Sequence, residues 1–251
     1  MDDSQLLRYS RHILLDELGP DAQQAFAAAE VVLVGMGGLG TPAAQYLAGA
    51  GIGTLTLCDA DHVDLTNLQR QVLYATPDVG KAKVDAAAAR IAAINPDVKT
   101  VRVAHRVGPA ELGPLAAAAD VVLDCSDNFA TRHAVNRACV AAATPLVSGA
   151  AIRFDGQVAV FDARDPSSPC YHCLFGEGDA LEETRCATMG VFAPLVGIVG
   201  ATQAAEALKL IAGVGASLAG RLLLLDALAM QWRELTVPRD PACPVCGARP
   251  G

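Results

Sequence analysis

Short apolar runs alternate with longer alanine-rich stretches through the first part of the chain, beginning with Glu30–Val34. Apolar, β-branched runs that end at Gly or Asp are typical of buried strands, and alanine-rich stretches favour helices. We expect strands at 30–34, 54–58, 98–103, 121–123 and 146–148. We expect helices between them at 42–50, 81–94, 109–118 and 131–143. This alternation predicts a Rossmann-like α/β fold, with a mostly parallel, doubly wound sheet covered by helices on both faces.

The pattern changes after about residue 152. Predicted strands at 157–161, 221–225 and 231–237 are not separated by helices in the same regular way, which favours an antiparallel half, and 196–211 is expected to form a buried helix. Two helices, 5–18 and 21–29, are predicted before the first strand, with Gly19 and Pro20 between them. We therefore expect one domain over 1–251 in three parts: 1–29, 30–152 and 153–251.

Composition narrows the class of protein. Of the 251 residues, 52% are hydrophobic and 18% are charged, which suffices for a sizeable core and excludes a disordered chain. A net charge of -8 without a basic run argues against nucleic-acid binding. The acidic N-terminus does not resemble a signal peptide, so we expect a cytoplasmic protein with reduced thiols. The apolar stretch 189–201 is shorter than a membrane span needs, and no membrane association is expected.

Glycines follow the first predicted strand in the spacing of a dinucleotide-binding loop, at Gly35, Gly37 and Gly40. Absent side chains let the backbone approach phosphate, and the next helix directs its N-terminus at the anion. Asp59 lies 19 residues after Gly40, at the end of the next strand, where a carboxylate binds ribose hydroxyls. We expect a nucleotide site, although the same glycines would also permit a tight turn, and NAD and ATP remain open.

Amides and cations follow the ribose acid, at Asn67, Arg70, Gln71, Lys81 and Lys83. A dehydrogenase has no general need for cations there, whereas triphosphate chemistry does, because cations neutralise the charge that develops as pyrophosphate departs. The alternative for each cation is a solvated position on a helix.

Asp124 and Asp127 end the fourth predicted strand, three residues apart. Carboxylates there could hold Mg²⁺ beside phosphates, through one carboxylate and waters. Alternatively, Asp127 caps the helix that follows.

Four of the eight cysteines form two C-x₂-C pairs, Cys170 with Cys173 and Cys243 with Cys246. Two such pairs suit a closed, tetrahedral structural Zn²⁺ site that would clamp the C-terminal tail onto the loop after residue 169, and redox-active pairs are the main alternative. His172 is expected to be a bystander.

The other cysteines divide into two groups. Cys58, Cys125 and Cys139 fall within predicted strands or helices or next to them, so packing explains them. Cys186 follows a polar loop and is the cysteine that we expect to be exposed and available for covalent chemistry, although an ordinary loop cysteine would look the same.

Taken together, these motifs resemble those of the bacterial E1-like adenylyltransferases of the HesA/MoeB/ThiF family, and the resemblance covers essentially the whole chain. The motifs that carry it are Arg8-Tyr9-Ser10-Arg11, Gly35-x-Gly-Gly-Leu-Gly40, Asp59, Asn67-Leu-Gln-Arg-Gln71, Lys83, Asp124-Cys-Ser-Asp-Asn128 and the two cysteine pairs.

The resemblance implies that the C-terminal glycine carboxylate of a ubiquitin-like carrier ending in GlyGly attacks the α-phosphate of ATP. The products are a carrier acyl-adenylate and pyrophosphate. By position, the family's nucleotide contacts fall on Gly35, Gly37, Gly38, Gly40, Asp59, Asn67, Arg70, Gln71 and Lys83. The residues for which a catalytic role is implied are Arg11, Arg70, Lys83, Asp127 as the Mg²⁺ ligand, and Cys186.

Further expectations come from the resemblance alone. The N-terminal arginine of the family reaches into the ATP site of a second subunit, so Arg11 implies a homodimer. The segment 30–152 would bind nucleotide, and 153–251 would bind the carrier and zinc. A separate sulfur donor, a desulfurase or a rhodanese, would be needed.

Two branches of the family compete. Residues 148–153 and 156–157 look more like the MoeB branch, which activates the small subunit of molybdopterin synthase, whereas 8–15 and 40–44 look more like the ThiF branch, which activates the thiamine sulfur carrier. We favour the MoeB branch. In the ThiF branch, the region that corresponds to Cys186 has a role in thiocarboxylate chemistry. Outside this family, an NAD-dependent oxidoreductase and a zinc-stabilised adaptor that binds nucleotide remain alternatives.

Overall fold

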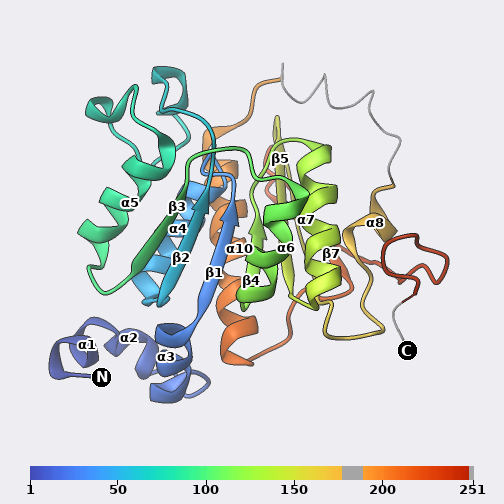
Figure 1. Cartoon of the computed structure of the whole chain (residues 1–251), viewed down its shortest axis with the longest axis horizontal. Coiled ribbons are helices and arrows are strands. Elements are labelled where there is room, and N and C mark those ends of the chain that lie inside the picture. The colour runs from blue at the N-terminus through green and yellow to red at the C-terminus, as the bar shows by residue number, and fades with distance from the viewer. Residues whose placement is uncertain (177–188, 249–251) are drawn as a thin grey trace.

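A single eight-stranded sheet runs through the protein in the order β3-β2-β1-β4-β5-β6-β7-β8 (Figure 1). The structure is a computed structural model and describes residues 1–176 and 189–248. The strands are β1 (Glu30–Val34), β2 (Thr54–Cys58), β3 (Lys99–Val103), β4 (Val121–Asp124), β5 (Leu146–Ile152), β6 (Asp155–Phe161), β7 (Arg221–Asp226) and β8 (Gln231–Thr236). Strands β1 to β5 are parallel and β6 to β8 antiparallel, which confirms the predicted fold class.

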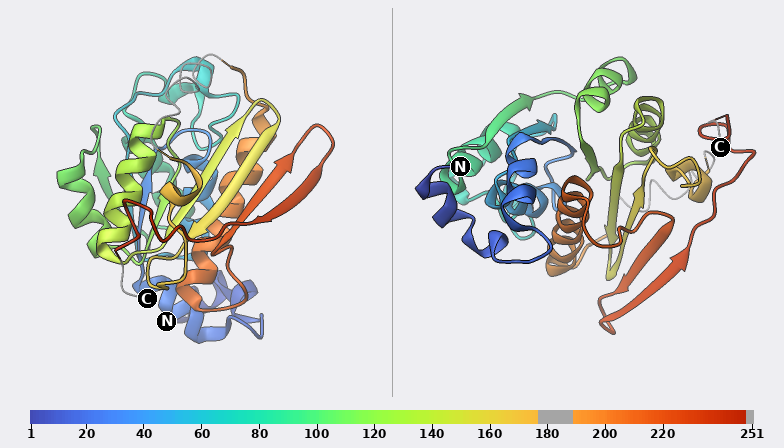
Figure 2. Two further views of the ribbon diagram at one scale, coloured as in Figure 1. Left: turned by 90° about the vertical axis from the view of Figure 1, so that its right-hand side faces the viewer. Right: turned by 90° about the horizontal axis from the view of Figure 1, so that it is seen from below.

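Helices cover both faces of the sheet. The longer ones are α3 (Gly19–Ala28), α4 (Gly40–Ala50), α5 (Lys83–Ile94), α6 (Pro109–Ala118), α7 (Phe129–Ala142) and α10 (Ala193–Ala212). One core cluster joins the sheet to α3, α4, α5 and α10, and a second joins it to α6 and α7. Figure 2 shows the β7–β8 hairpin extending away from these helices.

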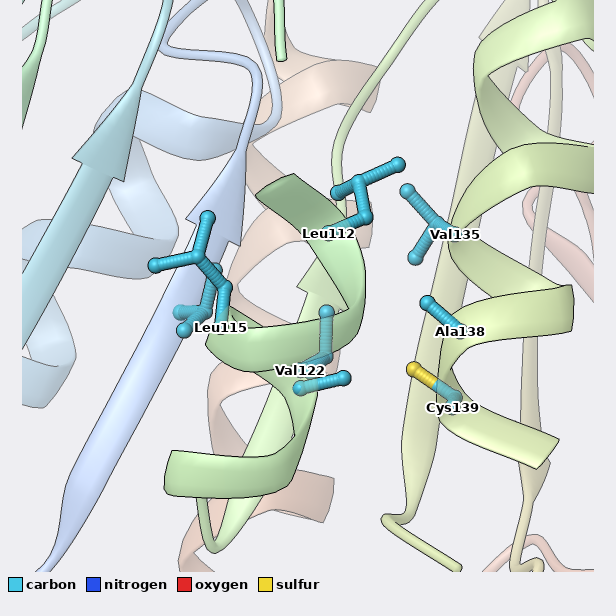
Figure 3. Close-up of a pocket in the computed structure, with 8 residues that line it drawn as sticks. Leu112, Leu115, Val122, Val135, Ala138 and Cys139 are labelled. Atoms are coloured by element: carbon cyan, nitrogen blue, oxygen red, sulfur yellow. The ribbon is translucent and has the colours of Figure 1, made fainter. Parts of the chain in front are cut away.

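Between α6, α7 and the sheet the core is closely filled. Val135 and Cys139 on α7 point toward α6, which carries Leu112, and Leu115 lies on the side of β1 (Figure 3); the space that these residues line with Val122 has no room for a water molecule. This contact is hydrophobic packing and offers no ligand site.

The N-terminal segment differs from the prediction. The single helix expected over 5–18 is wrong: the structure has two short helices, α1 (Asp3–Arg8) and α2 (Ser10–Ile13), which meet at Tyr9 with φ −98° and ψ 9°. Tyr9 is buried, and its hydroxyl accepts a hydrogen bond of 2.8 Å from Nδ2 of Asn95. The Tyr9 ring packs against Gly51, where a Cβ would lie 2.6 Å from it, so the break between the two helices coincides with a buried contact to a distant segment.

Strand β5 is longer than predicted. Only its first part pairs with β4, through Ser148, and the rest continues to Ile152 as one arm of a hairpin with β6. Glycine and alanine at 149–151 carry little strand propensity. The antiparallel pairing with β6, and not local preference, therefore extends the strand.

One described helix is long and apolar enough to span a membrane by length and composition. This helix is α10, with 20 residues and a mean hydropathy of 1.4 over an 18-residue window, so it continues past residue 201, where the apolar stretch was expected to end. Leu195, Val199 and Ala207 are fully buried, and the helix contacts α4, β5 and β6. Its apolar character therefore follows from its central place in the core.

Candidate nucleotide and metal sites

The glycine loop joins β1 to α4 and can form only with glycine at its key positions. Gly35 has φ +98°, and a Cβ there would lie 2.7 Å from the carbonyl oxygen of Cys125. A Cβ at Gly40 would overlap the carbonyl oxygen of Gly35. The loop leads into the N-terminus of an 11-residue helix without a side-chain cap. This geometry is that of an anion site.

Asp59 ties the glycine loop to the loop after β2. Its Oδ2 accepts a hydrogen bond of 2.7 Å from the backbone N–H of Met36, and its Oδ1 accepts one of 2.8 Å from the backbone N–H of Asp61. Tyr74 holds the same loop from the other side, because its hydroxyl donates to the carbonyl of Met36 at 2.8 Å. The predicted ribose acid therefore lies directly beside the predicted phosphate loop.

Lys83 places a buried cation beside these acids. Its side chain is only 7% exposed, and Nζ lies 2.8 Å from Oδ2 of Asp61 and 3.9 Å from Oδ2 of Asp59. The sequence analysis did not single out Asp61. The signal for it was the spacing of two acids at the end of β2, which we had interpreted through Asp59 alone.

The segment after β2 brings Gln71 to the glycine loop. Gln71 is buried, its Nε2 lies 3.6 Å from where a Cβ of Gly37 would stand, and its Oε1 has no hydrogen-bond partner among the described residues. Asn67 is the last residue of the short helix Leu65–Asn67 (η1), and its side chain accepts a hydrogen bond from the N–H of Asp64. Arg70 follows this helix and donates to the carbonyl of Thr66 at 3.2 Å.

The two acids after β4 have different surroundings. Asp124 is fully buried, its Oδ1 accepts hydrogen bonds from the N–H and hydroxyl of Ser126 at 3.0 and 2.6 Å, and burial raises its pKa. Asp127 is exposed. Asn128 caps α7 by accepting from the N–H of Thr131 at 2.9 Å, so the alternative in which Asp127 is the cap is wrong. An exposed carboxylate suits a hydrated Mg²⁺ better than a buried one.

The fold brings most predicted nucleotide residues to one edge of the sheet. The glycine loop, Asp59 and Asp127 follow the carboxyl ends of β1, β2 and β4, which are neighbours in the sheet, and Lys83 is tied to Asp59. Ligands bind at this edge of open parallel sheets. Helix α2 lies at the end of the sheet where β1 begins, away from this edge (Figure 1), and Arg11 is an exposed residue of that helix. Cys186 lies outside the described residues.

The four paired cysteines form one cluster. Their Sγ atoms all lie within 4.8 Å of one another, with 3.7 Å between Cys170 and Cys243 and 3.4 Å between Cys173 and Cys246. Thiolates around one tetrahedral Zn²⁺ are about 3.8 Å apart, so the donor set fits zinc. His172 is not part of the cluster. Burial opposes ionisation of Cys246, but hydrogen bonds from the other cysteines outweigh it and lower its pKa to about 7.

Three cysteines are core residues, as predicted. Cys58, Cys125 and Cys139 are buried, and burial raises the pKa of each thiol, that of Cys58 to about 12. Thiols with raised pKa values are poor nucleophiles. Packing therefore accounts for them.

Sequence analysis missed the buried polar residues behind the site. Gln203 on α10 is fully buried and donates to the carbonyl oxygens of Asp124 and Val147 at 2.9 and 3.1 Å. Arg132 and Asn136 are buried on α7. A polar residue within a strongly apolar helix was the available signal for Gln203, since a buried amide needs partners.

Comparison with known proteins agrees with this geometry. The ThiF family profile matches residues 9–245. The chain is 47% identical over 250 residues to the molybdopterin-synthase adenylyltransferase of Escherichia coli, covering 98% of both chains. It is 46% identical to the sulfur carrier protein ThiS adenylyltransferase of the same organism, covering 98% of this chain and 97% of that one.

Solved structures give the same result. E. coli MccB with ATP superimposes with a TM-score of 0.84 and 26% identity, over 96% of this chain and 73% of that one. Together with the profile match and the curated relatives, this shows that the chain belongs to the ThiF family.

Proposed function

We propose that this protein uses ATP to adenylate the C-terminal glycine carboxylate of a ubiquitin-like sulfur-carrier protein, forming an acyl-adenylate and releasing pyrophosphate. One observation supports the proposal above all. The glycine loop, Asp59, the buried Lys83 and the exposed Asp127 lie together at one edge of the sheet. Relatives at 46–47% identity are named adenylyltransferases of such carriers, which favours ATP over NAD and an enzyme over an adaptor.

Each site residue has a role that its surroundings support. Gly35, Gly37, Gly38 and Gly40 would line the phosphates, and Asp59 would bind the ribose. Asn67, Arg70 and Lys83 would contact phosphate, and Gln71 would be a further nucleotide contact. Asp127 would hold Mg²⁺, which supplies positive charge to the phosphates. A carboxylate nucleophile needs no strong general base, so catalysis rests on orientation and on neutralising the developing charge.

The carrier that we favour is the small subunit of molybdopterin synthase, in molybdenum cofactor biosynthesis. The thiamine-pathway carrier is the second candidate, because the two kinds of relative differ by one percentage point in identity. A rate comparison with both purified carriers separates the two.

The two larger parts of the domain would have different binding functions. Residues 30–152 bind nucleotide, and 153–251 bind the carrier and a structural zinc ion held by Cys170, Cys173, Cys243 and Cys246. We expect the protein to act in the cytoplasm without membrane or nucleic acid. A desulfurase or a rhodanese would supply sulfur, and Cys186 is the candidate for a covalent step in that transfer.

A homodimer would complete the ATP site. Arg11 is exposed and lies away from the nucleotide edge of its own chain, and exposed leucines flank it on the same segment, at Leu7 and Leu14. Arg11→Ala and Asp127→Ala should each be inactive alone, whereas mixed subunits should regain about a quarter of wild-type activity through heterodimers with one intact site. No recovery on mixing, with exchange of subunits verified, would refute the shared site.

The proposed reaction is tested by exchange of labelled pyrophosphate into ATP. Exchange should require both the protein and a carrier with an intact C-terminal glycine, and a carrier lacking that glycine is the matched control. Absence of exchange with every GlyGly-ending carrier of the same cell would overturn the proposal.

A further inference from the structure

Helix α7 connects the loop that carries Asp127 to the first cysteine knuckle. Arg132 and Asn136 are both buried and lie one turn apart on the same face of the helix. Nη2 of Arg132 donates to the carbonyl oxygen of Ser126 at 2.8 Å. Oδ1 of Asn136 accepts from the N–H of Tyr171 at 2.9 Å. One face of α7 therefore binds backbone groups of two other segments, the carbonyl of Ser126 and the N–H of Tyr171.

Ser126 is held from two directions. Asp124 accepts from its N–H and its hydroxyl, and Arg132 donates to its carbonyl oxygen. This carbonyl belongs to the peptide bond that joins Ser126 to Asp127, so fixing it fixes the backbone from which Asp127 projects. Asp127 itself is exposed, and its Oδ1 accepts a long hydrogen bond, 3.4 Å, from the side-chain amide of Asn128.

The charge on Arg132 is maintained in the interior. Burial opposes the charge, but Asp124, Tyr171 and Asp127 lie close enough that the pKa of Arg132 is raised above its usual value. A buried guanidinium is costly unless its charge and its donors are matched; here the charge of Asp124 favours the ionised form, and the Ser126 carbonyl accepts a hydrogen bond from Nη2. The geometry therefore suits Arg132 to orienting the backbone group that it binds.

We propose that Arg132 is a positioning residue for adenylation, which holds the Ser126 carbonyl and thereby fixes Asp127 at the nucleotide edge. The kinetic part of this inference rests on the adenylation proposed above. The structural part does not, because it concerns the order of residues 126–128 in the protein without substrate.

Amide hydrogen exchange tests the structural part. Arg132→Lys keeps the buried charge but not the planar donor geometry, and amides of residues 126–128 should exchange about tenfold faster. Protection of the glycine loop and the zinc content should not change. Arg137→Lys, at an exposed position of the same helix, is the matched control. Unchanged protection at 126–128 in Arg132→Lys would overturn the proposal.

Asp124→Asn is the second variant, used if Arg132→Lys does not fold. It preserves the shape of the side chain but removes the carboxylate that accepts from Ser126 and whose negative charge stabilises that of Arg132. Exchange at 126–128 should rise here as well. Wild-type protection in a folded Asp124→Asn protein would count against the proposal.

Kinetics test the second part. Arg132→Lys should lower kcat of carrier adenylation about tenfold with little change in KM for ATP, because misplacement of a catalytic group acts on the transition state. In an Asp127→Asn background the same substitution should cost nothing further. Additive losses would show that Arg132 does not act through Asp127. Wild-type protein without adenylation would refute the proposed function and leave the exchange result standing.

Discussion

The nucleotide edge and the cysteine cluster place reactive groups together by different means. At the nucleotide edge, loops that follow neighbouring parallel strands converge because the strands end at the same edge. The cysteine cluster joins two knuckles, at residues 170–173 and 243–246, that no shared strand register aligns. The comparison indicates that the first site is built by the sheet, whereas the second joins distant segments through a set of thiols that fits a metal ion.

The largest expected effect is on the cysteine cluster. Cys243→Ser should destabilise the protein by about 4 kcal/mol and lower Tm by about 10 °C, because zinc binding contributes directly to folding. Thermal unfolding with zinc analysis measures this, and Cys139→Ser is the control for loss of a buried thiol outside the cluster. Full zinc content and unchanged Tm in Cys243→Ser would contradict a structural metal site.

Asp127→Ala tests the nucleotide edge. Adenylation should fall by about 100-fold or more, since a carboxylate that organises the phosphate charge is lost. Folding and zinc content should remain, because the side chain is exposed. Asp16→Ala, an exposed acid outside the site, is the matched control. Unchanged adenylation would remove Asp127 from the mechanism.

Asp61→Asn tests the lysine contact. The kcat/KM for ATP should fall about tenfold, because Lys83 loses a charged partner that orients it. The stability cost should stay near 1 kcal/mol, since the Asp61 side chain is 71% exposed and solvent screens the pair. Kinetics and urea unfolding measure the two effects. Asp85→Asn, in an exposed pair with Arg102, is the control, and equal losses in both variants would refute the role.

The smallest expected effect is at the start of α7. Asn128→Ala removes the hydrogen bond to the Thr131 N–H and should cost about 1 kcal/mol of stability. Asn128→Asp keeps an accepting oxygen and should retain most of that stability in urea unfolding. Equal losses in both variants would show that the cap does not stabilise the helix.

Local spacing predicted much of this molecule. The glycine pattern identified the loop whose close approaches exclude side chains, and two C-x₂-C pairs identified the cluster, because both signals lie within a few residues. The alternation of strands and helices predicted the parallel part of the sheet, and the loss of that alternation after residue 152 predicted its antiparallel half.

Tertiary contacts explain what the sequence did not predict. The first predicted helix is interrupted at Tyr9, whose ring is buried against Gly51, and β5 lengthens because β6 pairs with it. Partners distant in sequence also hold the site: Gln203 binds the carbonyl of Asp124 from α10. Propensity and spacing carry no information on such contacts, since each depends on how distant segments pack.

Transfer of the α-phosphate tests the central claim most directly. Carrier ending in GlyGly should become labelled when ATP carries a radiolabel in its α-phosphate and should remain unlabelled when the γ-phosphate carries it. The Asp127→Ala protein should transfer neither label. Labelling from the γ-phosphate, or none from the α-phosphate with a carrier of the same cell, would contradict carrier adenylation.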